Sequence, residues 1–236
     1  MSTLPSDHPL RAYVATEMQA RPPDLLLAPQ RLFYLALFSE QGSASREWQQ
    51  LRELVQRYGV TLPDTPENHF SADLGAFRIR WERHTEYLRY TFIAPGPANM
   101  TASFNSGSVL DLVPRDWLAQ LQGQTIVATH ALLISSDEES LDLDALSATG
   151  FEGNALAGAS LLGGAAVALT DFHIHADGAS RWLVLDQGLT RRQAGRLLQT
   201  LLELDTYRVL AMLALPVARQ LGPLLGQHEE ELSAVT

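Results

Sequence analysis

Two histidines and an aspartate alternate along one short segment and could hold a divalent metal. Asp171, His173 and His175 are spaced two residues apart within a stretch, 165–176, that the sequence predicts as a β-strand. Successive side chains of a strand point to opposite faces, so these three are expected on one face. Imidazoles and carboxylates are ligands that zinc and other divalent metals accept. Asp171, His173 and His175 are therefore candidate metal ligands.

The same spacing is also typical of an ordinary polar strand face. Asp177-Gly178 is a strong hairpin signal before a second predicted strand, 181–185. A two-residue turn there would pair His173 with Trp182 and His175 with Ser180, which is cross-strand packing and not ligation. Because the spacing alone is common, we favour this structural interpretation, and the sequence predicts no cofactor.

A second group places an imidazole between two carboxylates. Glu82, His84 and Glu86 lie in an extended pattern, 77–93, and share one face if the strand is regular. Such an arrangement is suited to proton transfer, which makes these three the candidate catalytic residues. A straight strand of this length would reach about 60 Å, too long for the domain, so the chain is expected to turn or bulge near His84 and Thr85.

Arginines beside this group offer its carboxylates a structural role instead. They are Arg78, Arg80, Arg83 and Arg89. Ion-pair ladders of this kind are frequent on strands, and titratable clusters are often structural. We therefore expect Arg83 and either Glu82 or Glu86 in ion pairs, and an enzyme of the metal-dependent or general acid/base type is the alternative.

Composition excludes several kinds of chemistry. All 17 basic residues are arginine and cysteine is absent, which removes lysine Schiff bases, thiol nucleophiles, disulfides and thiolate metal sites. A formal net charge of −10 argues against nucleic-acid binding and against attraction to an anionic membrane. Residues 1–11 lack the apolar core of a secretory signal, which predicts a cytoplasmic location.

The order of predicted elements indicates an α/β domain. An apolar run at 32–38 predicts a buried strand, and a helix with Trp48, Leu51 and Leu54 on one face follows it. Together with the later strands, the pattern predicts a mixed sheet of about six strands with helices on both faces and a long C-terminal helix, in a single domain, 1–236. A Pro/Gly break at 94–97 separates two segments, 1–94 and 98–225, whose similar order of elements raises the hypothesis of related halves.

The C-terminal helix carries the strongest physical signal. It is predicted from a capping box, Thr190 with Gln193, to about residue 221, and it is apolar on too many sides for a surface helix. Its most apolar run, 209–225, is interrupted by Pro216, Arg219 and Pro223 and is expected to fall short of the roughly 20 residues of a membrane span. Helix 190–221 is therefore expected to self-associate or to pack against further helices.

Five ordered motifs resemble the domain of unknown function 3422 family across nearly the whole chain. The motifs are His8-Pro9-Leu10-Arg11, Ala20-Arg21-Pro22-Pro23, Trp81-Glu82-Arg83-His84-Thr85-Glu86-Tyr87 with Tyr90-Thr91-Phe92, Asp186-Gln187-Gly188-Leu189 continuing through Ala194-Gly195-Arg196, and Tyr207-Arg208 with Ala214-Leu215-Pro216. The family consists of uncharacterised bacterial proteins that are membrane-anchored and about twice this length. This chain stops at Thr236 and therefore resembles the soluble N-terminal half.

The resemblance implies a membrane-anchored protein whose soluble domain faces the cytosol at the inner membrane. Any membrane contact is expected from a segment beyond this chain. The family layout is similar to that of CorA-type magnesium channels, so the soluble domain of a CorA-like channel or transporter is a further alternative, by analogy of architecture only. The favoured expectation is a non-catalytic sensory, scaffold or assembly domain.

Overall fold

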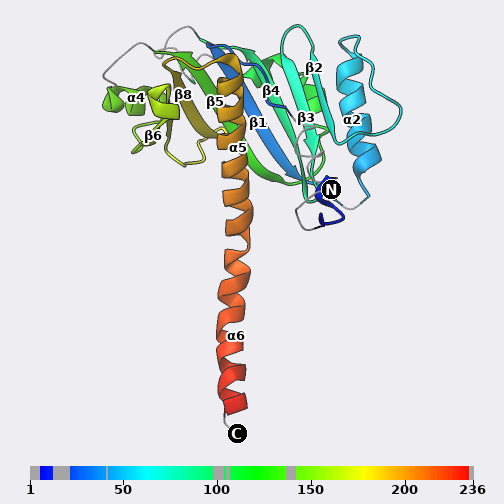
Figure 1. Ribbon diagram of the computed structural model, residues 1–236, viewed down its shortest axis with the longest axis vertical. Helices are drawn as coiled ribbons and strands as arrows, with labels where there is room; N and C mark the ends of the chain where they lie inside the picture. Colours follow the sequence, from blue (N-terminus) through cyan, green and yellow to red (C-terminus); the bar gives the residue numbers. More distant parts are fainter. Residues whose placement is uncertain are drawn as a thin grey trace.

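The chain forms one broad sheet crossed by a helix that extends far beyond it (Figure 1). The computed structural model describes residues 6–12, 22–40, 42–97, 104, 107–136 and 142–233. Ala20 and Arg21, which belong to one of the family-like motifs, lie outside the described residues. The predicted mixed α/β fold with a long C-terminal helix is confirmed.

Within the described residues the sheet has eight strands, where the sequence predicts about six. The strands are β1 Gln30–Phe38, β2 His69–Asp73, β3 Arg78–Arg83, β4 Tyr87–Pro95, β5 Thr125–Ser135, β6 Ala157–Leu161, β7 Ala166–Thr170 and β8 Ser180–Asp186. Their order is β2-β3-β4-β1-β5-β8-β7-β6, and of these eight described strands only β5 and β8 are parallel neighbours. The two additional strands, β2 and β6, are the short edges of the sheet.

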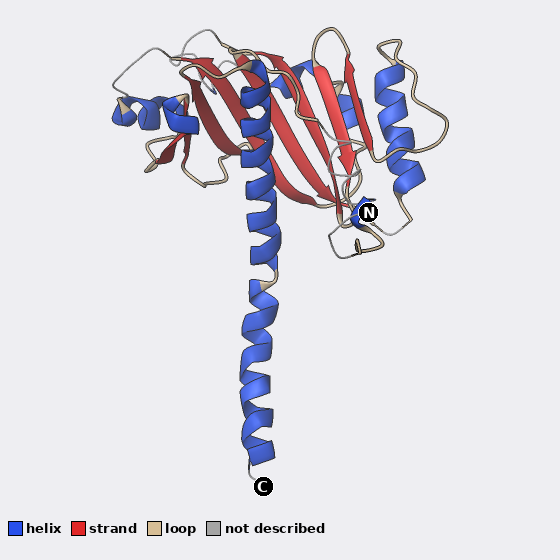
Figure 2. Ribbon diagram, in the orientation of Figure 1, coloured by secondary structure: helices blue, strands red, loops and turns tan. Residues whose placement is uncertain are grey.

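Helices cover both faces, as the sequence predicts (Figure 2). Phe33 and Leu37 of β1 pack on α2 (Ala44–Gln56), whereas Leu32 and Tyr34 face α5 (Arg191–Leu213), because neighbours along a strand point to opposite sides. The α2 face also carries the short helices η3 (Val109–Leu112), α3 (Arg115–Leu118) and α4 (Leu143–Gly150), while η4 (Leu162–Gly164) links β6 to β7.

The helix after β1 is amphipathic as expected. Trp48, Leu51, Leu54 and Val55 of α2 are all buried against the sheet. Each such side chain stabilises the fold by roughly 1.5–3 kcal/mol on burial. Gly59 adopts a positive φ of 74° just past the helix, a conformation that glycine adopts without strain.

The hypothesis of two related halves stays a prediction. Each half contains a strand, a helix and then three consecutive strands, and the strand order is symmetric about the β1–β5 pair. The pairings differ, however, because β1 is antiparallel to β4 while β5 is parallel to β8.

The C-terminal helix begins at the predicted capping box. Thr190 Oγ1 accepts a hydrogen bond from the backbone N–H of Gln193, and Gln193 Oε1 accepts one from the backbone N–H of Thr190. Near this end Gly195 lies so close to the segment before β1 that a Cβ would stand 1.7 Å from the Asp24 carbonyl oxygen. Only glycine therefore allows this helix to approach the chain there.

The helix then continues further than the sequence predicts. After a single interruption at Ala214, α6 (Leu215–Ser233) extends the same rod past both prolines (Figure 1). Pro216 lies in the first turn of α6, where its missing N–H needs no partner, so it does not end the helix. Pro223 is accommodated inside α6. We call residues 204–233 the stalk.

The sequence predicted that prolines make the apolar run 209–225 too short to cross a membrane. The length of the helix shows that this prediction is wrong. Among the described residues, Arg191–Gly226 is one helix whose length and composition alone would let it cross a membrane. None of its most apolar 18-residue window is buried within the domain.

Candidate functional site

Glu82 lies on the face of the sheet that α5 covers, between two buried arginines. Arg80 Nε and Nη2 donate to its two carboxylate oxygens, each at 2.9 Å, and Arg89 Nε donates to Oε2. Glu82 is 1% exposed and Arg89 2% exposed. Burial raises the pKa of Glu82, but the hydrogen bonds and charges of Arg80 and Arg89 outweigh it and lower that pKa to about 2. Glu82 is thus a buried, fully paired anion.

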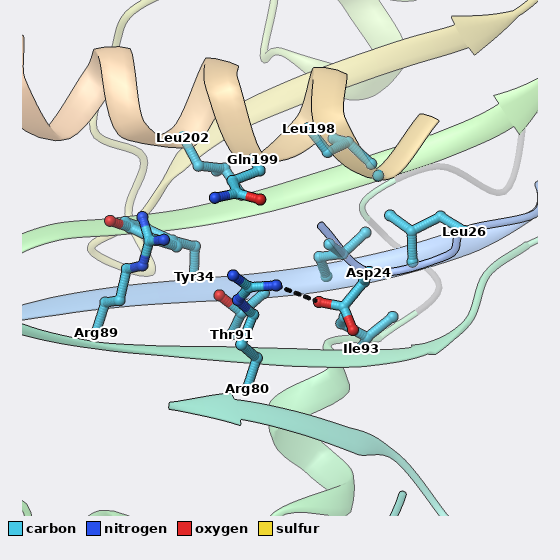
Figure 3. A pocket seen from close by; sticks show the side chains of 12 residues that line it. Asp24, Leu26, Tyr34, Arg80, Arg89, Thr91, Ile93, Leu198, Gln199 and Leu202 are labelled. Atoms are coloured by element: carbon cyan, nitrogen blue, oxygen red, sulfur yellow. Dashed lines mark ion pairs between the residues drawn. The ribbon is translucent and has the colours of Figure 1, made fainter. Parts of the chain in front are cut away.

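The arginines continue this network to neighbouring elements. Arg89 Nη1 lies 2.8 Å from Glu203 Oε1 of α5. Arg80 Nη1 lies 3.6 Å from Asp24 Oδ2 (Figure 3). Burial alone would lower the pKa of Arg89, but the Glu82 carboxylate raises it above its usual range. Two arginines thus face three carboxylates within the cluster, which leaves no excess positive charge to attract an anionic ligand.

The cavity beside this cluster is small. It measures about 30 Å³ and is lined by residues that include Arg80, Arg89, Thr91, Leu198 and Gln199 (Figure 3). A single water needs roughly 10–15 Å³ of such space. The cavity therefore has room for about two or three waters and is too small for an organic substrate.

The three candidate catalytic residues are not brought together. β3 ends at Arg83 and β4 begins at Tyr87, so the predicted turn near His84 is confirmed, and the regular strand on which a shared face depended is not formed. His84 stacks on Tyr87, with ring centroids 4.4 Å apart, and Glu86 is exposed in the turn. Arg83 pairs with Glu47 of α2 at 2.9 Å, and Glu82 pairs with Arg80 and Arg89, so the expected ion pairs of Arg83 and Glu82 are confirmed.

The second candidate group lies in a loop and not on a strand. β7 ends at Thr170 because the next residues turn: the Phe172 amide donates to Thr170 Oγ1, the His173 amide donates to Asp171 Oδ1, and Phe172 has a φ of 55°. Such local side-chain acceptors compete with the ladder of the sheet. The predicted alternation of Asp171, His173 and His175 on one strand face is therefore wrong, as are the predicted pairings of the two histidines across the hairpin.

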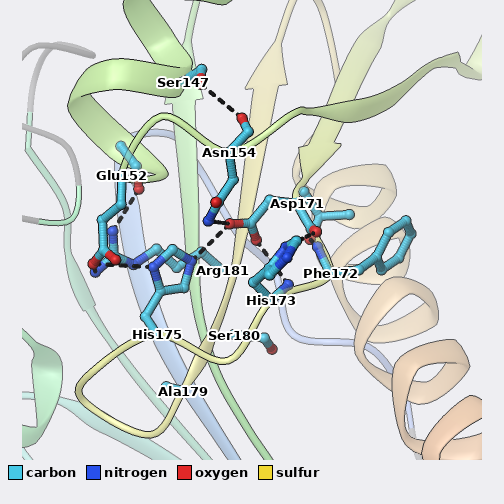
Figure 4. A network of polar contacts seen from close by, with 12 residues as sticks. Ser147, Glu152, Asn154, Asp171, Phe172, His173, His175, Ala179, Ser180 and Arg181 are labelled. Carbon is cyan, nitrogen blue, oxygen red and sulfur yellow. Dashed lines mark hydrogen bonds and ion pairs between the residues drawn. The ribbon is translucent and has the colours of Figure 1, made fainter.

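The loop nevertheless brings two of the three side chains into contact. His175 Nε2 lies 3.0 Å from Asp171 Oδ2, and His175 Nδ1 lies 3.2 Å from Glu152 Oε1, although neither contact has the direction of a hydrogen bond (Figure 4). Asn154 Nδ2 donates to Asp171 Oδ2 at 2.9 Å. His173 turns its ring to the Asp171 carbonyl and is exposed.

This arrangement suits a structural role better than catalysis or ligation. The His175 side chain is 1% exposed, and both its ring nitrogens face carboxylates, so neither is offered to a substrate. Among the described residues, no group of three or more histidine, aspartate or glutamate side chains has the geometry to hold a metal. Arg181 Nη1 completes the cluster by donating to the Gly150 carbonyl at 2.7 Å.

Several residues of these networks could not be found from sequence spacing. Asp24, Glu152, Arg181 and Glu203 each reach their partner from an element distant in sequence. The alternating pattern identified Glu82, Asp171 and His175 as polar residues in unusual places, but it gave no indication of these four.

A wider groove lies away from all six predicted site residues. It measures about 420 Å³ and is lined by residues that include Leu25, Leu27, Phe77, Arg78 and Arg191. None of the candidate catalytic or metal-binding residues faces it.

Fold and site together define a mixed α/β domain with a paired polar interior and one long projecting helix. A family model described as "Protein of unknown function (DUF3422)" matches residues 6–236, so the chain belongs to that family. No curated protein and no solved structure matches the chain.

Proposed function

We propose that this chain is a non-catalytic cytosolic domain of a membrane-anchored protein, with a sensory, scaffold or assembly role, and that it joins other helices through its stalk. The observation that carries the proposal is the set of apolar side chains that the stalk leaves in solvent. Nine of them are 49–71% exposed, namely Leu204, Tyr207, Met212, Leu213, Val217, Leu221, Leu224, Leu225 and Leu232. So many exposed apolar side chains on one helix are typical of an interaction site.

The polar clusters support the same proposal because they lack the features of an active site. An active site needs titratable groups that converge on a cleft able to admit a substrate. Glu82 and His175 are instead buried among their partners, and the cavity beside the Glu82 cluster holds little more than water. These groups fasten elements to one another, which is the requirement of a rigid scaffold.

Light scattering of the chain from low to high micromolar concentration tests the proposal. The wild-type chain is expected to exceed the mass of a monomer. Leu221→Glu should return it to a monomer, because the charge would have to be buried without a partner. Gln220→Glu, which adds the same charge at the adjacent exposed residue, should weaken self-association less.

A strict monomer at every concentration, with no helical partner from the rest of the protein, would refute this role for the stalk. Flotation with neutral phosphatidylcholine vesicles provides a second outcome. A monomeric chain that floats with the vesicles would show that lipid, and not another helix, covers these side chains.

A further inference from the structure

We propose that the wide groove beside the start of α5 binds a small organic anion with an apolar part, such as a medium-chain carboxylate. This inference goes beyond the proposed assembly role and does not depend on the stalk. The groove measures about 420 Å³ and lies where β1 begins and β4 ends. Sites for small organic ligands are typically clefts of roughly 300–1,000 Å³.

Charge in the groove favours an anionic ligand. The charged side chains that line it are Arg78, Arg191 and Asp73. Arg191 is exposed, and no ion pair joins it to another described residue. Arg78 Nη1 lies 3.9 Å from an oxygen of Asp24, a carboxylate that Arg78 shares with Arg80. Asp73 Oδ1 accepts a hydrogen bond from the backbone N–H of Gly75 at 2.8 Å, so this carboxylate is engaged in its own turn. Two guanidinium groups thus face one carboxylate within the groove.

The register of the sheet places one of these cations beside an apolar side chain. Arg78 of β3 is paired with Asp73 of β2 on one side and with Ile93 of β4 on the other. Residues directly paired across strands project from the same face of the sheet. Ile93 belongs to the core cluster that α5 covers, so Arg78 projects from that face as well. The floor of the groove therefore combines a cation with an aliphatic surface.

The apolar wall comes from the segment before β1. Leu26 is 2% exposed and packs into the core, whereas its neighbours Leu25 and Leu27 are 61% and 54% exposed and line the groove. The backbone N–H of Leu26 donates to the Arg191 carbonyl at 3.1 Å, which ties this wall to the start of α5. Arginine binds carboxylates through charge-assisted hydrogen bonds. Leucines beside the arginines fit a carboxylate with a hydrocarbon tail better than a bare inorganic ion.

The position of the groove favours a ligand from solution over a lipid surface. The groove lies at the end of the sheet where α5 begins, whereas the stalk leaves from the opposite end (Figure 1). The stalk alone is roughly 45 Å long at 1.5 Å per residue. A membrane that meets the tip of the stalk would therefore lie far from the groove.

Isothermal titration with octanoate tests the site, and acetate and octanol serve as comparisons because each carries only one of its two features. Octanoate should bind at one site per chain, and acetate and octanol should bind at least about tenfold more weakly. Arg191→Gln should raise the dissociation constant of octanoate about tenfold or more, because it removes a charge-assisted contact. Arg192→Gln removes the same charge at the next exposed residue, outside the groove, and should leave that constant nearly unchanged.

A further variant blocks the groove without removing an arginine. Ala76→Glu places a carboxylate in an exposed turn that lines the groove, and it should abolish octanoate binding. Ala76 and Arg191 are both exposed, so circular dichroism should show the wild-type fold in these variants.

Four results would overturn the inference. They are equal affinity for octanol and octanoate, equal losses in Arg191→Gln and Arg192→Gln, no saturation by octanoate up to about 10 mM, and octanoate binding that survives Ala76→Glu but is lost in Leu221→Glu. The last result would place the ligand on the stalk. Self-association measured by light scattering is a separate readout, so a failure of this inference leaves the proposed assembly role intact.

Discussion

Replacing Glu82 by glutamine tests the view that this carboxylate is structural. The substitution keeps the size of the side chain and removes its charge, leaving Arg80 and Arg89 with their common acceptor neutralised. Both arginines are at most 5% exposed. Arg89 retains Glu203, and Arg80 retains its longer contact with Asp24, so the loss is partial.

The magnitude follows from the pKa of Glu82. A carboxyl whose pKa is about 4.5 when unfolded and about 2 when folded contributes about 3 kcal/mol to the free energy of unfolding at neutral pH. Breaking a buried ion pair by removing one partner typically costs about 3–5 kcal/mol. The two estimates agree, and we expect Glu82→Gln to destabilise the domain by about 3 kcal/mol at pH 7.

The sign of the pH dependence is also fixed. Because folding lowers the pKa of Glu82, its contribution is complete above about pH 4.5 and is lost as the pH falls toward 2. The difference between wild type and Glu82→Gln should therefore shrink over that range. Glu86→Gln, in the exposed turn of the same hairpin, is the matched control and should change stability little at any pH.

Urea denaturation followed by circular dichroism at a series of pH values between 7 and 3 measures these differences. A loss below about 1 kcal/mol at pH 7 would show that the arginines are satisfied without Glu82. A loss that stays constant down to pH 3 would show that the carboxylate itself is not the cause.

Three further predictions concern packing, the hairpin turn and metal content. Gly195→Ala should destabilise the domain by several kcal/mol in the same urea assay, because its Cβ would overlap the Asp24 carbonyl; an unchanged midpoint would contradict the observed approach. His84→Ala should lower stability modestly, because it removes the stack of His84 on the tyrosine that begins β4. Isothermal titrations of wild type and variant with divalent metals and nucleotides should both stay flat. A stoichiometric binding event abolished by the substitution would contradict the structural role. The chain purified without chelator should contain no stoichiometric transition metal, because the His173 ring is turned away from the His175 contacts; about one zinc, nickel or iron per chain, lost in the His173→Ala, His175→Ala double variant, would contradict this.

The core of the fold could be predicted because its signal is local. The apolar run of β1 and the one-sided pattern of α2 each specify an element and the face it buries. The capping box at Thr190 likewise located the start of α5 to the residue. The edge strands were missed because β2 and β6 have no such pattern: β6, with the sequence Ala-Gly-Ala-Ser-Leu, is mostly exposed and is held in place by β7.

The candidate site was misread for a related reason. Alternating polar residues predict a strand face only where the backbone stays extended, and here the chain turns after Thr170 and again after Arg83. Asp171 causes part of that turn itself, since its side chain accepts from the backbone two residues on. The residues that look like a site by spacing are thus partly the residues that end the strands.

Two of the polar contacts hold α5 at the point where it leaves the sheet. Arg89 of β4 pairs with Glu203, and the Tyr34 hydroxyl of β1 lies 2.8 Å from Thr206 Oγ1. Burial raises the pKa of the Tyr34 phenol, which is protonated at neutral pH in any case and so can share that hydrogen bond. Apolar contacts alone would permit the helix to rotate, whereas directed polar contacts fix one orientation.

The loop that contains Asp171, His173 and His175 also contacts α5 and helps to hold it on the sheet. The Arg208 guanidinium lies over the Phe172 ring, 4.8 Å from its centroid, and Phe172 also packs edge-on against Trp182 of β8. Rotation by one residue would turn the helix by about 100° and break this contact together with the two before it. Since Met212, Leu213 and Val217 follow Arg208 on the same rod, the contacts that fix the helix also fix the directions in which these exposed side chains face. In the proposed assembly role, the buried polar residues set which side of the stalk a partner helix meets.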